Sequence, residues 1–335
     1  MAYSISCSLQ RLKQWDEFLT AIRSFFKADG FMEVNTPTLV VSPGLEPFIE
    51  PFKTKLTIGR FEQITYLPTS PEFHLKKLLA AGCEKIFEIC PCFRNGEVGP
   101  AHQPEFMMLE WYRAHSNIQD IRKDVLKLLE NLNSNLDSKE GGILPYLGTP
   151  EIKTMSQLFE NIEFQLTPTT SRNQMADLAT RLGINFESED SFDDIFFRVF
   201  LEKIEPYLGL DNPLIVANFP PSQSALANIN DEGWTDRFEV FWRGVEIANA
   251  YDELTDPNEY RRRFQSWQKQ RLKNSTNLEG DDSRTLPIDE DLLKALESGI
   301  PHSGGIALGL DRLFMAFYGE KDIANIRPFI LRYPY

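Results

Sequence analysis

Two pairs of neighbouring alternating segments constrain the fold of this chain more than any other feature. Residues 85–93 (KIFEICPCF) and 105–114 (EFMMLEWYRA) are predicted to be strands, and a long polar loop with glycine and proline joins them. Residues 237–254 (RFEVFWRGVEIANAYDEL) are predicted to form a second pair around a two-residue turn at Arg243-Gly244. The sequence therefore predicts two hairpins, the first with an unusually long tip.

The first hairpin separates its residues into two faces. Alternation puts Phe106, Met108, Glu110 and Tyr112 on one face of the second strand, opposite Met107, Leu109 and Trp111. Loops as long as the one at this tip are usually functional. Arg94 and His102, at its two ends, could fold over a polyanion, and Phe106 could stack on a flat heterocycle. Each residue alone also fits an ordinary core or surface role.

The second hairpin gathers acidic residues. With the turn at Arg243-Gly244, Glu239 lies diagonal to Glu246 on one face, and two carboxylates without a cationic partner would repel each other. A bound Mg²⁺ would relieve that repulsion, while the alternative is two solvated glutamates. Asn249, Tyr251 and Glu253 have the opposite parity, so they reach this face only through a bulge or a strong twist.

Apolar spacing predicts helices around these hairpins. Residues 9–29 have helical periodicity and end at Gly30, and Ser70 is placed to cap a helix that runs to Gly82. Residues 304–310 (GGIALGL) are predicted to be a buried strand that enters a helix with Arg312 in its first turn. A cation there opposes the helix dipole, so we expect either a bound anion or a neighbouring acid.

Composition limits the classes of function. The net charge of −14 disfavours non-specific nucleic-acid binding, although a local basic patch would still be compatible with tRNA. We find no signal peptide and no membrane-length apolar run, and the four cysteines are too few for a disulfide framework. These features predict a cytoplasmic protein. Cys90 and Cys92 (CPC) fit buried thiols better than a metal site, because no second Cys/His pair accompanies them.

Four stretches together resemble the class II aminoacyl-tRNA synthetases. Residues 30–39 (GFMEVNTPTL), 93–112 (FRNGEVGPAHQPEFMMLEWY) and 304–313 (GGIALGLDRL) are similar to motifs 1, 2 and 3 of that class. Residues 237–256 resemble the lysine-binding stretch of lysyl-tRNA synthetases. The resemblance covers nearly the whole chain. It implies an α+β fold, with an antiparallel sheet flanked by helices, and a homodimer.

Within that class, the sequence resembles the truncated paralogues that form the elongation factor P–(R)-β-lysine ligase family. Motif 1 begins near residue 30, which leaves no room for an anticodon-binding domain. We expect one catalytic domain over residues 1–335 with a mostly helical insertion at about 115–212. Ser70, the stretch 219–227 (FPPSQSALA) and Ala307 match the ligase form. The methyl group of Ala307, in place of a synthetase glycine, can change substrate preference by ~1–3 kcal/mol.

The resemblance implies a role for each matching residue. Arg94 and Arg312 would be catalytic, stabilising charge on ATP. A magnesium ion would be held by Glu239 and Glu246. The ATP-binding residues would be Arg94, Asn95, Glu97, His102, Gln103, Phe106, Glu239 and Arg312. The residues that bind a lysine-like substrate would be Ser70, Glu72, Glu110, Tyr112, Asn249, Tyr251, Glu253 and Ala307.

The implied reaction activates lysine or (R)-β-lysine as an aminoacyl-adenylate and transfers it to a lysine of elongation factor P. The sequence departs from the family pattern at Gly96, where motif 2 carries a glutamate that meets adenine, and Gln103 replaces a usual asparagine. Glu97 could take over that contact, a backbone carbonyl could suffice, or the chain could be non-catalytic. A small synthetase that charges tRNA and a regulatory paralogue are the alternative functions.

Overall fold

The computed structural model describes residues 2–136, 149–274 and 285–332. Contacts divide the chain into two compact units, residues 1–144 with 254–335 and residues 145–253. Both are built from helices and mostly antiparallel strands, which confirms the predicted α+β class. The expected insertion at 115–212 straddles this division, and its residues 137–148 lie outside the described ranges.

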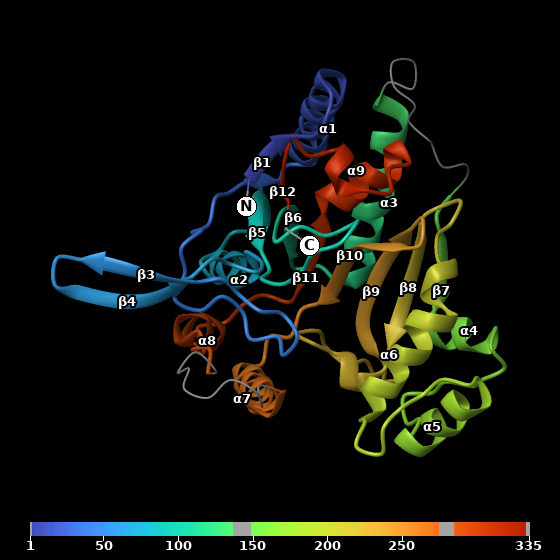
Figure 1. Ribbon diagram of the computed structural model, residues 1–335. Helices are drawn as coiled ribbons and strands as arrows, with labels where there is room; N and C mark the ends of the chain where they lie inside the picture. The colour runs from blue at the N-terminus through green and yellow to red at the C-terminus, as the bar shows by residue number, and fades with distance from the viewer. Residues whose placement is uncertain (1, 137–148, 275–284, 333–335) are drawn as a thin grey trace. The chain divides into compact units, whose positions relative to one another are not determined.

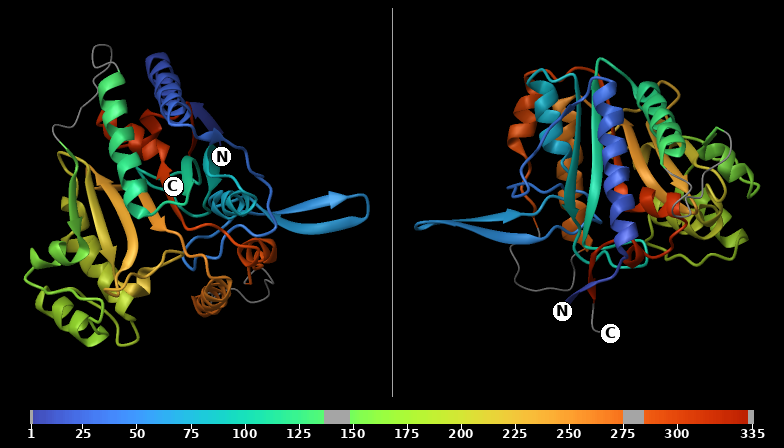
Figure 2. Two further views of the ribbon diagram at one scale, coloured as in Figure 1. Left: turned by 180° about the vertical axis from the view of Figure 1, so that it is seen from behind. Right: turned by 90° about the horizontal axis from the view of Figure 1, so that it is seen from above.

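The first unit contains three sets of paired strands (Figure 1). In the main set, β2 (Met32–Glu33), β5 (Lys85–Phe93), β6 (Glu105–Ala114) and β11 (Ser303–Gly309) lie in that order, and only the β2–β5 pairing is parallel. β3 (Lys53–Ile58) and β4 (Phe61–Tyr66) form a two-stranded ribbon. β1 (Ala2–Ile5) pairs with β12 (Phe329–Arg332), which brings two distant parts of the chain side by side (Figure 2).

Helices cover the two faces of the main strands in the first unit. On one face, Phe26 of α1 (Leu9–Ala28) packs on Phe87 and Trp111, and the Trp111 indole donates to Asp124 of α3 (Ile118–Asn135). On the other, Leu75 and Leu79 of α2 (Glu72–Ala80) pack with Ile86 and Tyr112. The predicted alternation of β6 is therefore confirmed, and the face with Glu110 and Tyr112 turns toward α2.

The remaining helices of the first unit follow the lysine-binding-like stretch. α7 (Pro257–Asn274) packs on α8 (Glu290–Glu297), which in turn packs on α2. α9 (Leu310–Tyr318) follows β11 directly, as predicted, and Arg312 lies in its first turn. The short helix Ile323–Asn325 leads to β12.

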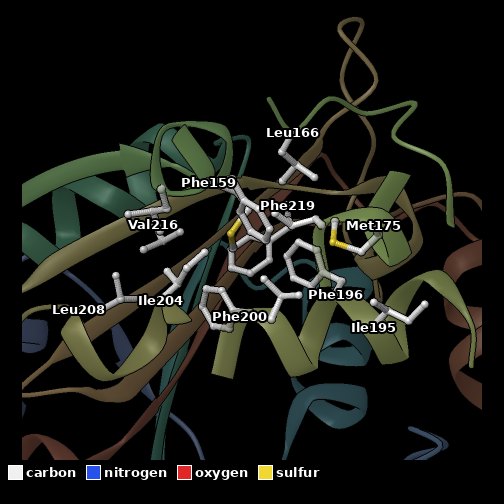
Figure 3. Packing of buried hydrophobic residues seen from close by; sticks show 14 of the residues in the cluster. Phe159, Leu166, Met175, Ile195, Phe196, Phe200, Ile204, Leu208, Val216 and Phe219 are labelled. Carbon is white, nitrogen blue, oxygen red and sulfur yellow. The ribbon is translucent and has the colours of Figure 1, made fainter. Parts of the chain in front are cut away.

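The second unit arranges its strands in the order β7 (Glu151–Thr154), β8 (Leu214–Phe219), β9 (Thr235–Trp242) and β10 (Val245–Asp252). Its helices are α4 (Met155–Glu160), α5 (Arg172–Arg181) and α6 (Phe192–Lys203), with short 3₁₀ turns at Glu205–Tyr207 and Pro221–Gln223. Aromatic and aliphatic side chains from these helices and from β8 form its core (Figure 3). Apolar burial of this extent is the dominant favourable term in folding.

Candidate functional site

The first half of the site lies where α2 begins, against the inner face of β6. The helix starts at Glu72, one residue later than predicted, and the Ser70 hydroxyl accepts from the Glu72 backbone N–H at 3.0 Å. The same hydroxyl contacts Oε1 of Glu110, and Tyr112 donates to Oε2 of Glu110 at 3.3 Å. Ser70, Glu72, Glu110 and Tyr112, four predicted substrate residues, are thus brought together.

Glu110 has an unusual environment for a carboxyl group. Its side chain is completely buried. Burial, together with the nearby Glu72 carboxylate, raises the pKa of Glu110 to about 8, against the opposing effect of hydrogen bonds from Ser70 and Tyr112. Glu110 is therefore largely protonated at neutral pH in the free protein, and an approaching cation would favour its ionised form.

Sequence reasoning missed three residues next to this pocket. Lys76 is completely buried, and its ammonium lies 2.5 Å from Glu72 Oε1 and 2.8 Å from the hydroxyl of Tyr260. Glu88, paired across the strands with Glu110, is also buried and accepts from the Thr36 backbone N–H. A signal existed for Lys76, because it lies one turn after Glu72 on the apolar stripe of α2.

The second group of predicted residues lies at the tip of the β5–β6 hairpin. The Arg312 guanidinium is 2.5 Å from Nε2 of His102, which must accept because arginine has only donors. The Arg94 guanidinium lies 5.0 Å from the centre of the Phe106 ring. Nε of Arg94 is buried and has no hydrogen-bond partner among the described residues. α9 thus meets the hairpin loop at His102, and Arg94 lies by the Phe106 ring on the same hairpin.

The loop adopts a backbone that suits Gly96. This residue has φ of +83°, a conformation that a glutamate rarely adopts, and open space surrounds its Cα. The adjacent Glu97 turns toward Arg94, with 3.9 Å between Oε2 and the guanidinium. Asn95 is exposed, and its backbone N–H donates to the Glu50 carbonyl at 2.7 Å.

The two remaining predicted residues of the first unit are Gln103 and Ala307. Gln103 lines a cavity of about 680 Å³, whose wall is otherwise formed by Phe52, Leu67, Phe93, Pro104, Glu105, Arg327, Pro328 and Phe329. No other predicted site residue lies in that wall. Ala307 is paired with Glu110 across β11 and β6, and it packs with Phe106 on Cys90, Cys92 and Met108.

The second unit presents its predicted residues on the β9–β10 hairpin. Arg243 and Gly244 form the turn, both with positive φ, and Glu246 pairs with Phe241 as predicted. A register shift between Glu246 and Ala248 then places Asn249 opposite Glu239. The expected bulge is therefore present, and it brings Asn249 and Tyr251 onto the face of Glu239.

The expectation that Glu239 lacks a cationic partner is wrong. Arg237, two residues earlier on the same face, contacts Oε1 of Glu239 and donates to Oδ1 of Asn249 at 3.0 Å and to the Gln223 carbonyl at 2.9 Å. The Asn249 amide in turn donates to the Tyr251 hydroxyl at 2.9 Å. Burial raises the pKa of Glu239, and the Arg237 guanidinium opposes that rise. One guanidinium therefore connects the predicted metal and substrate residues of this unit.

The two remaining acidic residues that were predicted for the site, Glu246 and Glu253, differ in burial. Glu246 is half-buried. Glu253 is 1% exposed, and its backbone carbonyl accepts from the Asn228 side-chain amide at 3.0 Å. Among the described residues no group of three or more His, Cys, Asp or Glu side chains is arranged to hold a metal ion. The Glu246 carboxylate contributes to the raised pKa of Glu239, so the two side chains lie near each other, and carboxylate oxygens are the kind of ligand that Mg²⁺ takes together with phosphate oxygens.

Three further features bear on the expectations from the sequence: the cysteine pair, the arginines of α7 and the apolar character of the helices. Cys90 and Cys92 are buried thiols with 4.0 Å between their sulfur atoms. The four arginines of α7 all pair with acids, because Arg261 pairs with Glu290, Arg262 and Arg263 pair with Glu259, and Arg271 pairs with Glu50. Within the described residues, no helix combines the length and apolar character needed to span a bilayer.

Comparison of the sequence with known proteins places this chain in a family. The model for class II tRNA synthetases (D, K and N) matches residues 6–331. The elongation factor P–(R)-β-lysine ligase of Pectobacterium carotovorum subsp. carotovorum (strain PC1) is 36% identical over 331 residues, which cover 97% of this chain and 96% of the relative. The proteins of the same name from Pectobacterium atrosepticum and Enterobacter sp. (strain 638) are 35% and 34% identical with the same coverage.

Proposed function

Because the chain belongs to the family of class II tRNA synthetases of the D, K and N type, we propose that it is an ATP-dependent amino-acid ligase. Its substrate is (R)-β-lysine or lysine, which it activates as an aminoacyl-adenylate. It then transfers the aminoacyl group to a lysine side chain of elongation factor P, the protein named in its relatives.

The acidic pocket beside α2 carries this proposal. A buried ammonium group needs anionic partners, because its desolvation is otherwise too costly. Glu72 and the deeply buried Glu110 supply carboxylates within one hydrogen-bonded group, and Tyr112 adds a hydroxyl. We assign the pocket to the amino groups of a lysine-like substrate, with Ala307 narrowing it opposite Glu110. In the second unit, Asn249, Tyr251 and Glu253 are assigned to substrate binding because they match the lysine-binding stretch of the family.

The hairpin tip supports ATP binding. Arg94, with its buried and unpartnered Nε, has spare donor capacity for a phosphate oxygen. His102 and Arg312 are held together, and the half-buried Phe106 ring provides an aromatic surface for adenine. We assign the α-phosphate to Arg94, the outer phosphates to His102 and the adenine to Phe106 and Arg312. Asn95, Glu97 and Gln103 are assigned to the rest of the nucleotide.

Mg²⁺, when bound at Glu239 and Glu246, would supply positive charge against the phosphate oxygens. In the first step the substrate carboxylate attacks the α-phosphorus of ATP, the bond to the β-phosphate oxygen breaks and pyrophosphate leaves. Arg94 and Arg312 stabilise the charge that develops on the phosphate. In the second step an amine attacks the acyl carbon, an amide forms, and AMP leaves as the amine loses a proton. Enzyme groups act by position and charge, so no covalent nucleophile is needed.

The acceptor is tested by following labelled amino acid. The protein, ATP, Mg²⁺ and labelled (R)-β-lysine or lysine are incubated with purified elongation factor P or with bulk tRNA. We expect label on elongation factor P and not on tRNA, because the arginines of α7 already pair with acids. Label on tRNA alone would favour the tRNA-charging alternative, and formation of no adenylate with any lysine isomer would leave the non-catalytic alternative.

We also infer that the protein works as a cytoplasmic homodimer. Met32, Leu39, Val41 and Phe48, within or just after the motif-1-like stretch, are 45–74% exposed, and large exposed apolar side chains close together along the chain are candidates for an interface. The four cysteines are free thiols, as in a reducing compartment. Sedimentation velocity at micromolar concentration should give about twice the chain mass, and a monomer would refute the dimer.

A further inference from the structure

Lys76 is a charged side chain at a completely buried position, where removing the charge from water costs free energy. It has no exposed surface and projects from α2 one turn beyond Glu72. Its ammonium contacts Oε1 of Glu72 at 2.5 Å and the Tyr260 hydroxyl at 2.8 Å, and it lies 5.5 Å from the centre of the Tyr260 ring. A buried ion pair adds little net stability compared with apolar residues of similar size. Folding alone therefore gives little reason to have a lysine here.

The acidic groups around Lys76 suggest another reason. Glu72 keeps 14% of its side-chain surface exposed, so its carboxylate still faces the pocket. The Glu110 carboxyl is linked to the Glu72 backbone through the single hydroxyl of Ser70. Without the Lys76 ammonium, the Glu72 carboxylate would lie near the Glu110 carboxyl with no positive charge to offset their repulsion. The ammonium of Lys76 fixes one Glu72 oxygen and offsets part of the negative charge.

The hydroxyl of Tyr260 is the second hydrogen-bond partner of the Lys76 ammonium. Tyr260 lies in the first turn of α7, it is completely buried, and its ring packs edge-on against Phe264. Further along α7, Arg271 donates to the backbone carbonyls of Glu46 and Ile49. Glu46 belongs to the wall of a small cavity that also contains Ser70 and Glu72. α7 thus contacts the surroundings of the acidic pocket at two points, through Tyr260 and through Arg271.

We propose that Lys76, held by Tyr260, is a positioning residue that fixes the Glu72 carboxylate and sets the charge of the amino-acid pocket. The proposal rests on the assignment of this pocket to a lysine-like substrate. It predicts that disturbing Lys76 impairs recognition of the amino acid and leaves recognition of ATP nearly unchanged.

The test uses Tyr260→Phe, which removes one hydroxyl group, and Lys76→Met, which removes the charge. The matched control is Lys77→Met, on the same helix, because Lys77 pairs with Asp289 and not with Glu72. ATP–pyrophosphate exchange gives separate KM values for amino acid and for ATP, and thermal melting monitors folding. We expect the amino-acid KM to rise about 3- to 10-fold in Tyr260→Phe and more in Lys76→Met. The ATP KM in both, and all constants in Lys77→Met, should stay within about twofold of wild type.

A second comparison tests whether Lys76 acts through Glu72. Calorimetric binding of (R)-β-lysine is measured for Glu72→Gln and for Glu72→Gln combined with Tyr260→Phe. The hydroxyl deletion should cost no further affinity in the Glu72→Gln background, as expected for residues that act together.

The outcomes separate this proposal from the proposed function. If wild type shows no exchange with any lysine isomer, the proposed function fails. If wild type is active and Tyr260→Phe leaves the amino-acid KM within twofold, the positioning role is refuted. It is equally refuted if the variants raise both KM values together with a loss of thermal stability, since that pattern indicates a structural role.

Discussion

The acidic pocket of the first unit and the β9–β10 hairpin of the second each contain a cationic side chain among acidic residues. In the first, the Lys76 ammonium binds one oxygen of Glu72 and the Tyr260 hydroxyl. In the second, the Arg237 guanidinium binds Glu239, Asn249 and the Gln223 carbonyl at once. An ammonium acts as a point charge, whereas a guanidinium is a planar fork with five donors. The first region is therefore organised by charge and the second by orientation.

This difference has a consequence for Asn249. Because Oδ1 of its amide accepts from Arg237, the Nδ2 group is turned to the other side, where it donates to Tyr251. The amide thus presents donors to its surroundings, as the amide orientation is fixed by the network. In the first pocket, by contrast, Glu72 and Glu110 present acceptors or a single acidic proton. The two regions therefore differ in the hydrogen-bonding groups that they offer.

Of the changes that test this comparison, we expect substitution of Arg237 to have the largest effect, on the free energy of unfolding. Arg237→Leu leaves Glu239 buried without its cation and Asn249 without its orienting donor. We expect a loss of about 3–5 kcal/mol in the free energy of unfolding, measured by urea titration. Arg198→Leu is the control, because Arg198 forms a half-exposed pair with Asp190 and should cost less than about 1 kcal/mol. Equal losses in the two variants would show that Arg237 holds no network.

A second prediction concerns protons in the first pocket. The Glu110 pKa of about 8 means that binding of a cation at pH 7 should release close to one proton. Calorimetry of (R)-β-lysine binding in two buffers of different ionisation enthalpy measures that release. Apparent affinity should rise from pH 6 to pH 8, as deprotonating Glu110 becomes easier.

Glu110→Gln should abolish this proton release, while the control Glu105→Gln, at an exposed position on the same strand, should retain it. The same shift affects stability. The folded protein binds this proton between the unfolded pKa near ~4.5 and about 8, so the contribution of Glu110 is complete below that range and is lost as the pH rises through 8. A wild-type protein that releases no proton would contradict the account of this pocket.

The smallest effect is expected at the hairpin tip. Glu97→Ala should raise the ATP KM a few-fold, corresponding to ~1 kcal/mol, with the amino-acid KM unchanged. The reason is that Glu97, next to Gly96, is the carboxylate turned toward Arg94. An unchanged ATP KM in the exchange assay would mean that Glu97 does not substitute for the missing motif 2 glutamate.

Much of this arrangement follows from local rules in the sequence. Alternation fixed which side chains of 105–114 face inward, and the positive φ angles that Arg243-Gly244 can adopt predicted the second turn. Parity even indicated the bulge, because Asn249 could not otherwise reach Glu239. These inferences succeed because each depends on residues close together along the chain.

The sequence could not reveal contacts that depend on tertiary packing. Lys76 meets Tyr260 across 184 residues, and no periodicity relates the two. Arg237 was within reach of prediction, since it shares a face with Glu239, but its bond to the Gln223 carbonyl was not. The backbone of the loop at Gly96 likewise depends on its surroundings, including the Asn95 bond to the Glu50 carbonyl.

The central claim is that the acidic pocket selects an amino acid by its ammonium groups for activation with ATP. The most direct measurement is ATP–pyrophosphate exchange by the wild-type protein with (R)-β-lysine, lysine and norleucine, an analogue of lysine without the terminal amine. We predict exchange with at least one lysine isomer and none above background with norleucine. Exchange with norleucine at a comparable kcat/KM, or no exchange with either lysine isomer, would contradict the account.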